Sequence, residues 1–284
     1  MEISRVGIVG AGTMGSGIAQ VCAASGIDVT LIDVSDEVLD RARKTMEKSL
    51  ARLVKKEAIT EQQSTEALRR VSTATSLSAV KETQFVIEAV IEDRDLKRKI
   101  FAELDGLAGK EVILATNTSS ISITDIAAAT GRADKVIGMH FMNPVPVMKL
   151  VEIIRGLATS DVTYQAVEAL ATRVGKTPVE VQDYPGFVSN RVLMPMINEA
   201  IYCLMEGVAD REAIDTVMKL GMNHPMGPLA LADLIGLDVC LHIMEVLYSG
   251  YSDSKYRPCP LLRKMVAAGR LGRKTASGFY DYSA

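Results

Sequence analysis

The chain has 284 residues, of which 48% are hydrophobic and 24% charged, a composition typical of a soluble globular protein long enough for two domains. A net charge of −3 gives no electrostatic reason to expect a nucleic acid or an anionic membrane as partner. No apolar run reaches the ~18 residues that span a bilayer. The first residues enter a predicted strand at once, so we expect no signal peptide and a cytoplasmic location. The four cysteines and three histidines lack metal-binding or disulfide spacing, which predicts reduced thiols and no metal.

The beginning of the chain carries a glycine motif in the context that dinucleotide binding requires. Residues 6–9 form a short apolar strand, residues 16–24 are helical in pattern, and the sequence Gly-Ala-Gly-Thr-Met-Gly lies between them. Gly10 allows the tight turn, Gly12 allows a pyrophosphate to approach the backbone, and Gly15 allows the helix to pack closely on the strand. A lone motif of this kind is weak, but strand, glycines and helix in this order predict a dinucleotide site.

An acidic residue at the end of the next strand identifies the preferred cofactor. Residues 28–32 are apolar in pattern, and Asp33 follows them, about twenty residues beyond the motif as the ribose-binding acid should be. Its carboxylate accepts hydrogen bonds from ribose hydroxyls and repels a 2′-phosphate. No arginine follows in residues 34–36. The sequence therefore predicts NAD rather than NADP.

Two further helices are predicted at residues 37–55 and 61–70, with Thr60 as the cap of the second. A simple nucleotide-binding fold needs only one crossover helix here, so the pair should protrude. Arg52 and Lys56 lie four residues apart and share a helix face. Their charges alone favour a solvated surface.

The next strands end in polar residues at the edge where parallel sheets bind ligands. A strand at residues 83–91 ends at Glu92, and the following helix has Lys97 in its first turn. A lysine is unfavourable there against the helix dipole unless it has an anion or hydroxyl partner. The strand at residues 111–115 leads into a polar loop. There the next helix takes Ser122 or Thr124 as its cap, which leaves Ser119 to face a ligand or to be an ordinary loop hydroxyl.

A histidine and a glutamate are then placed to form a pair. His140 ends a predicted strand at residues 136–139, Glu152 lies in a second strand at residues 150–154, and a proline-rich turn joins them. A carboxylate that accepts a hydrogen bond from one ring nitrogen fixes the tautomer and leaves the other nitrogen as a base. Taken alone, the pair is more typical of a structural histidine at a strand end beside a surface glutamate. The upstream dinucleotide motif favours catalysis, because hydride transfer needs an accompanying proton carrier.

The second half of the chain changes to helical periodicity with glycine and proline interruptions. We predict helices at residues 187–206, 210–220 and 229–248, the last interrupted at Gly236, and a loop over the C-terminal tail. Asn190 lies one turn into the first of these, where an amide does not favour a helix and can face a cleft. The expected fold is therefore an α/β Rossmann-type NAD-binding domain over residues 1–185, with a protruding helical pair, and an all-α domain over residues 186–284.

The motifs together resemble one family, the NAD-dependent L-3-hydroxyacyl-CoA dehydrogenases, over essentially the whole chain, and most closely its short bacterial members that act on 3-hydroxybutyryl-CoA. The matching segments are Gly-Ala-Gly-Thr-Met-Gly (10–15), Asn-Thr-Ser-Ser (117–120), His-Phe-Met-Asn-Pro (140–144), Gly-Phe-Val-Ser-Asn-Arg (186–191), Pro-Met-Gly-Pro (225–228), Gly-Leu-Asp (236–238) and Gly-Arg-Lys-Thr (272–275). This resemblance implies reversible oxidation of a short (S)-3-hydroxyacyl-CoA in fatty acid or butanoate metabolism.

The resemblance also implies roles for single residues. His140 is the general acid/base, Glu152 its partner, and Ser119 and Asn190 hold the substrate's 3-oxygen and neighbouring carbonyl. The implied NAD contacts are Gly10, Gly12, Thr13, Met14, Gly15, Asp33, Glu92, Lys97, Asn117, Asn143 and Lys274. Arg52 and Lys56 match the helical region that meets the CoA part of the substrate. Members of the family are commonly dimers formed through the helical C-terminal domain. The same domain is expected to contribute to the substrate cleft.

Two other functions fit parts of the same pattern. One is an NAD-dependent dehydrogenase of a small hydroxy acid without CoA, which would turn over free 3-hydroxybutyrate as well as its CoA ester. The other is a binding or structural protein that keeps the dinucleotide fold and has lost turnover. The intact set of His140, Glu152, Ser119 and Asn190 argues against this second alternative.

Overall fold

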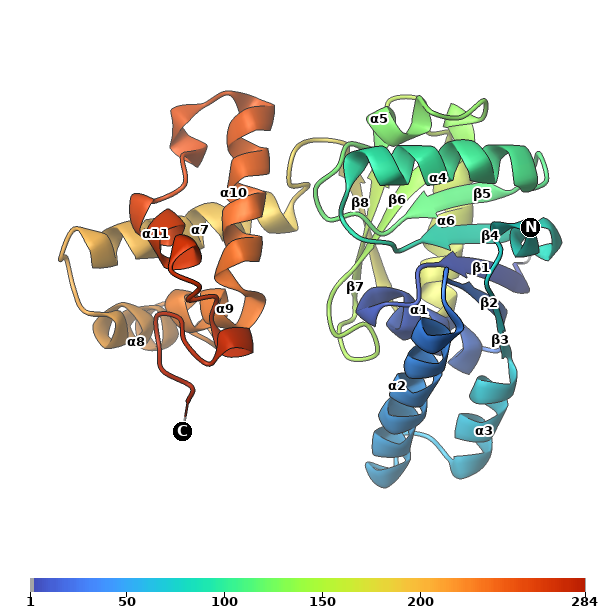
Figure 1. Cartoon of the computed structure of the whole chain (residues 1–284), viewed down its shortest axis with the longest axis horizontal. Helices are drawn as coiled ribbons and strands as arrows, with labels where there is room; N and C mark the ends of the chain where they lie inside the picture. Colours follow the sequence, from blue (N-terminus) through green and yellow to red (C-terminus); the bar gives the residue numbers. More distant parts are fainter. Residues whose placement is uncertain (1–2, 284) are drawn as a thin grey trace. The chain divides into compact units, whose positions relative to one another are not determined.

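The computed structural model describes residues 3–283 and divides into two compact units, Met1–Asp183 and Tyr184–Ala284. The N-terminal unit is a sheet covered by helices and the C-terminal unit is helical (Figure 1). This confirms the expected α/β domain followed by an all-α domain. No helix in residues 3–283 combines the length and the apolar character needed to cross a membrane.

The N-terminal unit contains one eight-stranded sheet with the strand order β3-β2-β1-β4-β5-β6-β7-β8. Its strands are β1 (Arg5–Val9), β2 (Asp28–Ile32), β3 (Val71–Ala74), β4 (Phe85–Glu88), β5 (Ile113–Thr116), β6 (Val136–Phe141), β7 (Leu150–Arg155) and β8 (Thr177–Gln182). The first six strands in chain order are parallel, β7 is antiparallel to β6, and β8 is parallel to β7. The central strands are buried on both faces, which is why they read as continuous apolar runs.

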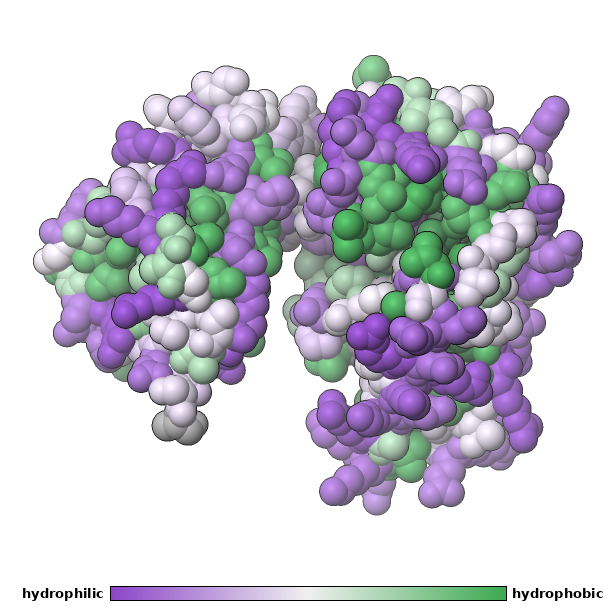
Figure 2. All heavy atoms as spheres, in the orientation of Figure 1, coloured by the Kyte–Doolittle hydropathy of each residue, from purple (hydrophilic) through white to green (hydrophobic). Residues whose placement is uncertain are grey.

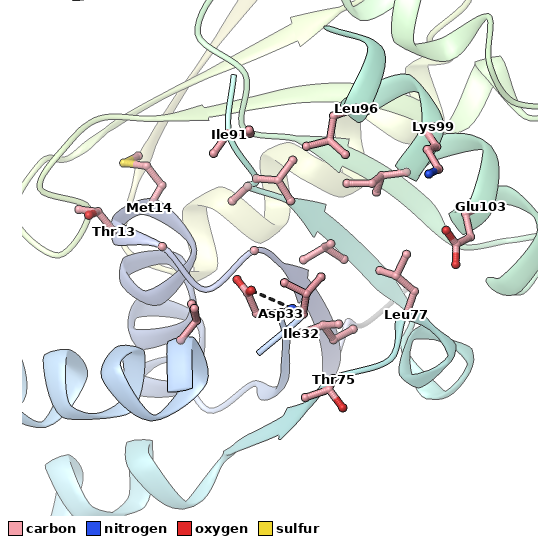
Figure 3. Close-up of a pocket in the computed structure, with 18 residues that line it drawn as sticks. Thr13, Met14, Ile32, Asp33, Thr75, Leu77, Ile91, Leu96, Lys99 and Glu103 are labelled. Atoms are coloured by element: carbon pink, nitrogen blue, oxygen red, sulfur yellow. Dashed lines mark hydrogen bonds between the residues drawn. The ribbon is translucent and has the colours of Figure 1, made fainter. Parts of the chain in front are cut away.

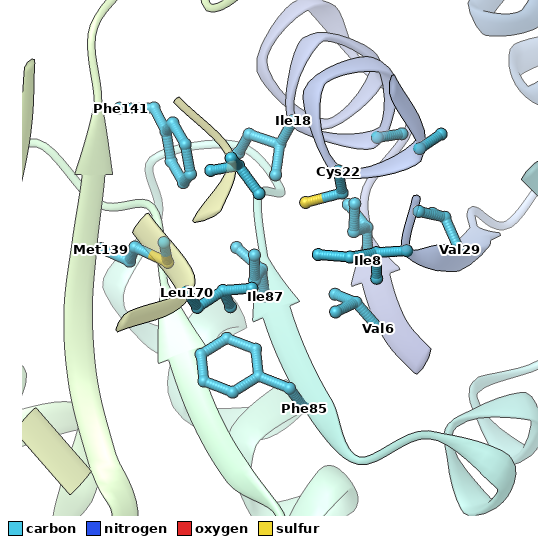
Figure 4. Close-up of a cluster of buried hydrophobic side chains, with 14 of the residues drawn as sticks. Val6, Ile8, Ile18, Cys22, Val29, Phe85, Ile87, Met139, Phe141 and Leu170 are labelled. Atoms are coloured by element: carbon cyan, nitrogen blue, oxygen red, sulfur yellow. The ribbon is translucent and has the colours of Figure 1, made fainter. Parts of the chain in front are cut away.

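Helices cover both faces of this sheet. They are α1 (Thr13–Ala24), α2 (Asp36–Lys55), α3 (Glu61–Arg69), α4 (Arg94–Leu107), α5 (Ile123–Ala127) and α6 (Asp161–Arg173), with short 3-10 turns at Leu77–Glu82 and Ala133–Lys135. One buried cluster joins α1 and α6 to alternate residues of the strands (Figure 4). It includes Ile18 of α1, Leu170 of α6, and Met139 and Phe141 of β6. Successive side chains of a strand point to opposite faces, so His140, between Met139 and Phe141, points to the other face.

Helices α2 and α3 extend from the sheet as the predicted pair (Figure 1). Thr60 caps α3 in a capping box, its hydroxyl accepting from the backbone N–H of Gln63 while the Gln63 side chain accepts from that of Thr60. Leu39, Ala42 and Met46 lie on the buried stripe of α2. Figure 2 shows that the pair presents a mainly hydrophilic surface and that a hydrophobic surface lies between it and α4.

Strands β3 and β8 lie at the two edges of the sheet and were not predicted from the sequence. In β3 only Val71 is buried, and most residues of β8 are partly or fully exposed, so neither strand has the apolar run that marked the central strands. Helix α6, between β7 and β8, was missed as well. Its buried positions, Thr163, Val167, Leu170 and Ala171, include a threonine that weakens the helical pattern.

The C-terminal unit consists of α7 (Ser189–Met205), α8 (Arg211–Gly221), α9 (Pro228–Ile235), α10 (Leu237–Tyr251) and α11 (Pro260–Ala267), with 3-10 turns at Ser254–Tyr256 and Arg273–Thr275. Asp210 caps α8 through the backbone N–H of Ala213. Gly236 separates α9 from α10 with a φ of 106°, which favours glycine and explains the interruption predicted there. Helix α11 was not predicted from the sequence, and the tail at residues 271–280, expected to be a loop, contains only the 3-10 turn at Arg273–Thr275.

Candidate active site

Of the three motif glycines, Gly10 and Gly15 are required by the backbone around them, and Gly12 borders open space. A Cβ on Gly10 would lie 2.7 Å from the carbonyl oxygen of Ala89, and one on Gly15 would lie 1.7 Å from the carbonyl oxygen of Gly10. Gly12 has nothing within 4 Å of its Cβ position, so the space beside it is open at the start of α1. A helix N-terminus beside open space suits a pyrophosphate, whose charge it stabilises through backbone N–H groups.

Asp33 follows β2 and fixes the glycine turn as well as facing a cavity. Its Oδ2 accepts from the backbone N–H of Ala11 at 2.7 Å, and its Oδ1 accepts from that of Val34 at 2.8 Å, the bond drawn in Figure 3. Each carboxylate oxygen can accept a second hydrogen bond, so both remain suited to ribose hydroxyls.

The cavity beside Asp33 has a volume of about 710 Å³ (Figure 3). Its walls come from the glycine turn, β2, the segment after β4 and α4, and they include Gly10, Gly12, Thr13, Met14, Ile32, Asp33, Val38, Leu77, Val90, Leu96 and Ile100. This mostly apolar hollow at the carboxyl edge of the sheet, with an acid and a helix N-terminus at its rim, fits the adenosine and pyrophosphate of NAD.

A fully buried ion pair lies next to this cavity. Lys97, in the first turns of α4, and Glu88, at the end of β4, both have no exposed surface. The Lys97 Nζ donates to Glu88 Oε1 at 2.7 Å, while the second oxygen of Glu88 accepts from the hydroxyl of Thr116 at 2.7 Å. Glu88 Oε1 also accepts from the backbone N–H of Val90 at 2.6 Å. The anion partner that the position of Lys97 required is thus Glu88, an acid inside an otherwise apolar run.

Glu92 holds the polar loop after β5. Its Oε1 accepts from the Thr118 hydroxyl at 2.7 Å, from the backbone N–H and hydroxyl of Ser119 at 2.8 and 3.1 Å, and from both groups of Ser120 at 3.0 Å. Its Oε2 lies 3.7 Å from Lys97 Nζ. Burial raises the pKa of Glu92, but the charge of Lys97 and these donors outweigh burial and hold the pKa below its usual value. A single ionised carboxylate therefore sets the conformation of the loop that carries Ser119.

His140 and Glu152 face each other on adjacent antiparallel strands. They are direct register partners in β6 and β7, and the His140 Nδ1 lies 2.8 Å from Glu152 Oε2. Both side chains are almost fully buried. Asn117 joins the neighbouring strand end to this pair, because its Oδ1 accepts from the backbone N–H of Phe141 at 2.9 Å. The two side chains thus lie within hydrogen-bond distance, as the sequence predicted, and a carboxylate in this position can fix the tautomer of an imidazole.

The other predicted site residues are placed as follows within each unit. Asn143 is exposed on the loop between β6 and β7, and Arg52 and Lys56 are exposed at the end of α2. Asn190 is buried in the first turn of α7 in the C-terminal unit. Lys274 belongs to the same unit and pairs with Asp238, its Nζ donating to Oδ2 at 2.6 Å.

The two units match separate models of one family. Residues 5–184 match the 3-hydroxyacyl-CoA dehydrogenase NAD-binding domain, and residues 186–282 match the 3-hydroxyacyl-CoA dehydrogenase C-terminal domain. The chain belongs to the 3-hydroxyacyl-CoA dehydrogenase family. This confirms the resemblance inferred from the motifs and identifies NAD as the cofactor of the N-terminal unit.

Individual members of the family match over their full length. A probable 3-hydroxybutyryl-CoA dehydrogenase of Bacillus subtilis (strain 168) is 60% identical over 282 residues, which cover 99% of this chain and 98% of that protein. The 3-hydroxybutyryl-CoA dehydrogenase of Bradyrhizobium diazoefficiens is 55% identical over 99% of this chain and 96% of its own length. The crystal structure of (S)-3-hydroxybutyryl-CoA dehydrogenase from Ralstonia eutropha is 58% identical, covers both chains completely, and superposes with a TM-score of 0.97.

Proposed function

We propose that the protein catalyses the reversible NAD-dependent oxidation of (S)-3-hydroxybutyryl-CoA to acetoacetyl-CoA. The observation that carries this proposal is the buried His140–Glu152 pair at the sheet edge that also carries the glycine turn and Asp33. Relatives named for this reaction match the chain from end to end, which supports the short acyl chain.

The chemistry assigned to the chain's own residues is a proton transfer. NAD, when bound, supplies the acceptor for the hydride from C3. His140 takes the proton of the 3-hydroxyl group on its Nε2, because Nδ1 is engaged by Glu152. Glu152 stabilises the imidazolium that forms, and in the reverse direction the same imidazolium protonates the 3-keto oxygen.

Ser119 and Asn190 are proposed to hold the substrate oxygens. The Ser119 hydroxyl and backbone N–H both donate to Glu92, so the position of this residue is fixed before a substrate arrives. A preformed contact of this kind lowers the entropic cost of aligning the reacting oxygen with His140. Asn190 is proposed as the second donor, on the basis of the family resemblance and its place in the first turn of α7.

The remaining contacts are proposed from the family pattern together with local placement. Gly10, Gly12, Thr13, Met14, Gly15 and Asp33 belong to the loop, helix and strand ends that fit NAD, and Glu92, Asn117, Asn143 and Lys274 complete the proposed set. A direct contact of Lys97 with NAD stays a prediction, and its complete burial against Glu88 favours an action through Glu92 instead. Arg52 and Lys56, both exposed, are proposed to meet the phosphates of CoA.

A homodimer through the C-terminal unit is also proposed. Large apolar side chains of this unit are exposed in the single chain, among them Val208 at 71% and Leu220 at 82%. Exposed apolar surface of this kind is typical of an interface between subunits. Light scattering coupled to size-exclusion chromatography tests the assembly, and a monomer at micromolar concentration would refute it.

The test of the reaction is NADH oxidation with acetoacetyl-CoA, followed by absorbance. We expect turnover with the CoA ester and little with free acetoacetate. His140→Gln should lower kcat by about 10²–10⁴-fold. His242→Gln is the matched control, because this second histidine lies on α10, outside the proposed site. Equal activity on the free acid would favour a dehydrogenase of small hydroxy acids, and NADH binding without any turnover would favour the non-catalytic alternative.

A further inference from the structure

Lys176 is a buried cation that the proposed reaction leaves without a role. It lies between the C-terminus of α6 and the start of β8. Its backbone N–H donates to the carbonyl of Ala171, and the backbone N–H of Gly175 donates to the carbonyl of Thr172. Its side chain is buried, with the residue only 8% exposed. In residues 3–283 it forms no ion pair with a carboxylate; its Nζ donates instead to the backbone carbonyls of Val145 and, at 2.8 Å, of Met148.

The surroundings of this ammonium make its presence costly. Burial lowers the pKa of Lys176 below its usual value. The titratable neighbour on α1 is Cys22, and burial raises the pKa of its thiol to about 12, so the thiol is neutral at pH 7 and does not compensate the charge. A buried cation paired only with carbonyl dipoles contributes less to stability than an apolar side chain of similar volume would. The stability of the fold therefore does not account for a lysine here.

Both acceptors of Lys176 belong to one loop, residues 142–149, which joins the strand of His140 to the strand of Glu152. Within the loop, the backbone N–H groups of Val147 and Met148 both donate to the carbonyl of Pro144. The Val145 side chain is buried against α1, where a Cβ on Gly17 would come within 2.9 Å of the Val145 Cβ. The loop is thus fastened to the dinucleotide helix by Val145 and to the start of β8 by Lys176.

We propose that Lys176 is a positioning residue, whose ammonium holds loop 142–149 so that Asn143 meets NAD and the strands that carry His140 and Glu152 keep their register. This proposal rests on the proposed function. The order of the loop can be measured without turnover, so the role of Lys176 and the proposed function can be refuted independently.

The chain contains no tryptophan, so Val147→Trp places a single fluorescent reporter on the exposed part of the loop. In this background Lys176→Met removes the donors and keeps the aliphatic stem. We expect the acrylamide quenching constant to rise at least about twofold and the fluorescence anisotropy to fall. Without the reporter, Lys176→Met should lower kcat by about 10–100-fold, since a misplacement of about 1 Å can cost 10²-fold. The KM for NADH should rise by more than about threefold, while that for acetoacetyl-CoA stays within about twofold, because Asn143 is the loop's proposed ligand contact.

Two control variants separate positioning from general stability. Arg132→Met removes another buried cation that donates to backbone carbonyls, including that of Ala108 at 3.1 Å, near the opposite, amino edge of the sheet. Lys149→Met removes an exposed charge from the loop itself. Both should leave the reporter and the KM for NADH unchanged at temperatures well below their unfolding transitions.

The proposal is overturned if Lys176→Met leaves quenching and both KM values unchanged, or if Arg132→Met changes them equally at the same loss of thermal stability. Should Lys176→Met not fold, Lys176→Gln keeps one donor group and should give intermediate values; wild-type values in that variant would equally overturn it. Absence of turnover in the unmodified protein, with the reporter responding as expected, would contradict the proposed function and leave the loop assignment standing.

Discussion

The buried pair of Glu88 and Lys97 permits a quantitative prediction. Removing one partner of a buried ion pair costs about 3–5 kcal/mol, because the other charge is left uncompensated. For a domain of this size 1 kcal/mol lowers the Tm by about 2–4 °C, so Glu88→Gln and Lys97→Met should each lower it by roughly 6–20 °C. The double variant removes both charges. The amide oxygen that Glu88→Gln leaves in place can still accept from Val90 or Thr116, so we expect the double variant to be more stable than either single variant, with a coupling energy above about 2 kcal/mol.

The assay is thermal and urea unfolding of the four proteins, combined with NADH titration of those that are folded. Single costs that add in the double variant would refute the coupling. Because both side chains are fully buried, the double variant should bind NADH with a Kd within about threefold of the unmodified protein. A tenfold weaker Kd, about 1.4 kcal/mol, in a folded double variant would show instead that Lys97 contributes to NAD binding, directly or through Glu92.

Substitutions at three further carboxylates test their separate roles. Glu92→Gln should lower the Tm at pH 7, because the pKa of Glu92 is depressed in the folded protein and its charge therefore stabilises the fold. This stabilisation is fully present above the ordinary pKa of 4.5 and is lost as the pH falls through the lower pKa of the folded protein. The difference in Tm between Glu92→Gln and the unmodified protein should therefore shrink below pH 4.5. A difference that stays constant down to pH 3 would contradict this role of the Glu92 charge. Glu152→Gln should lower kcat at least about tenfold through the loss of the charge beside His140, with the Kd for NADH unchanged; loss of folding instead would favour a structural role. Asp33→Ala should lower the ratio of activity with NAD to activity with NADP by about 10–100-fold, the factor expected from the loss of one charge-assisted hydrogen bond. Asp33→Asn, which keeps the acceptor for Ala11, should narrow it less, and an unchanged ratio in both would refute the role of the charge.

The parts of the fold that could be predicted from the sequence depend on local signals. The glycine turn, the acid at Asp33, the cap at Thr60 and the break at Gly236 are each set by residues close to one another in the chain. The pairing of His140 with Glu152 was predictable for the same reason, since a hairpin brings the ends of consecutive strands together.

The contacts that could not be predicted join segments far apart in the chain. Lys176 meets Val145 from another part of the sheet, and nothing near either residue in sequence indicates the contact. Glu92 was predicted to contact the cofactor, and nothing in the sequence indicated that it also accepts hydrogen bonds from the loop that carries Ser119. Glu88 offered a signal, an acid within an apolar strand, but its partner became visible only when β4 and α4 were placed side by side.

Asp33, Glu92 and Glu152 are three of the acids at the carboxyl edge of this sheet, and their hydrogen-bond partners determine which of the three can take part in proton transfer. Asp33 accepts from backbone N–H groups, which do not titrate. Glu92 accepts from hydroxyl and backbone groups and faces Lys97, so its charge is fixed in the range where the enzyme would operate. Only Glu152 among these three bonds to an imidazole, the side chain whose charge changes near neutral pH. A substitution at Glu152 should therefore alter the pH dependence of kcat, whereas neutral substitutions at Asp33 or Glu92 should alter binding and stability and leave the shape of that profile unchanged.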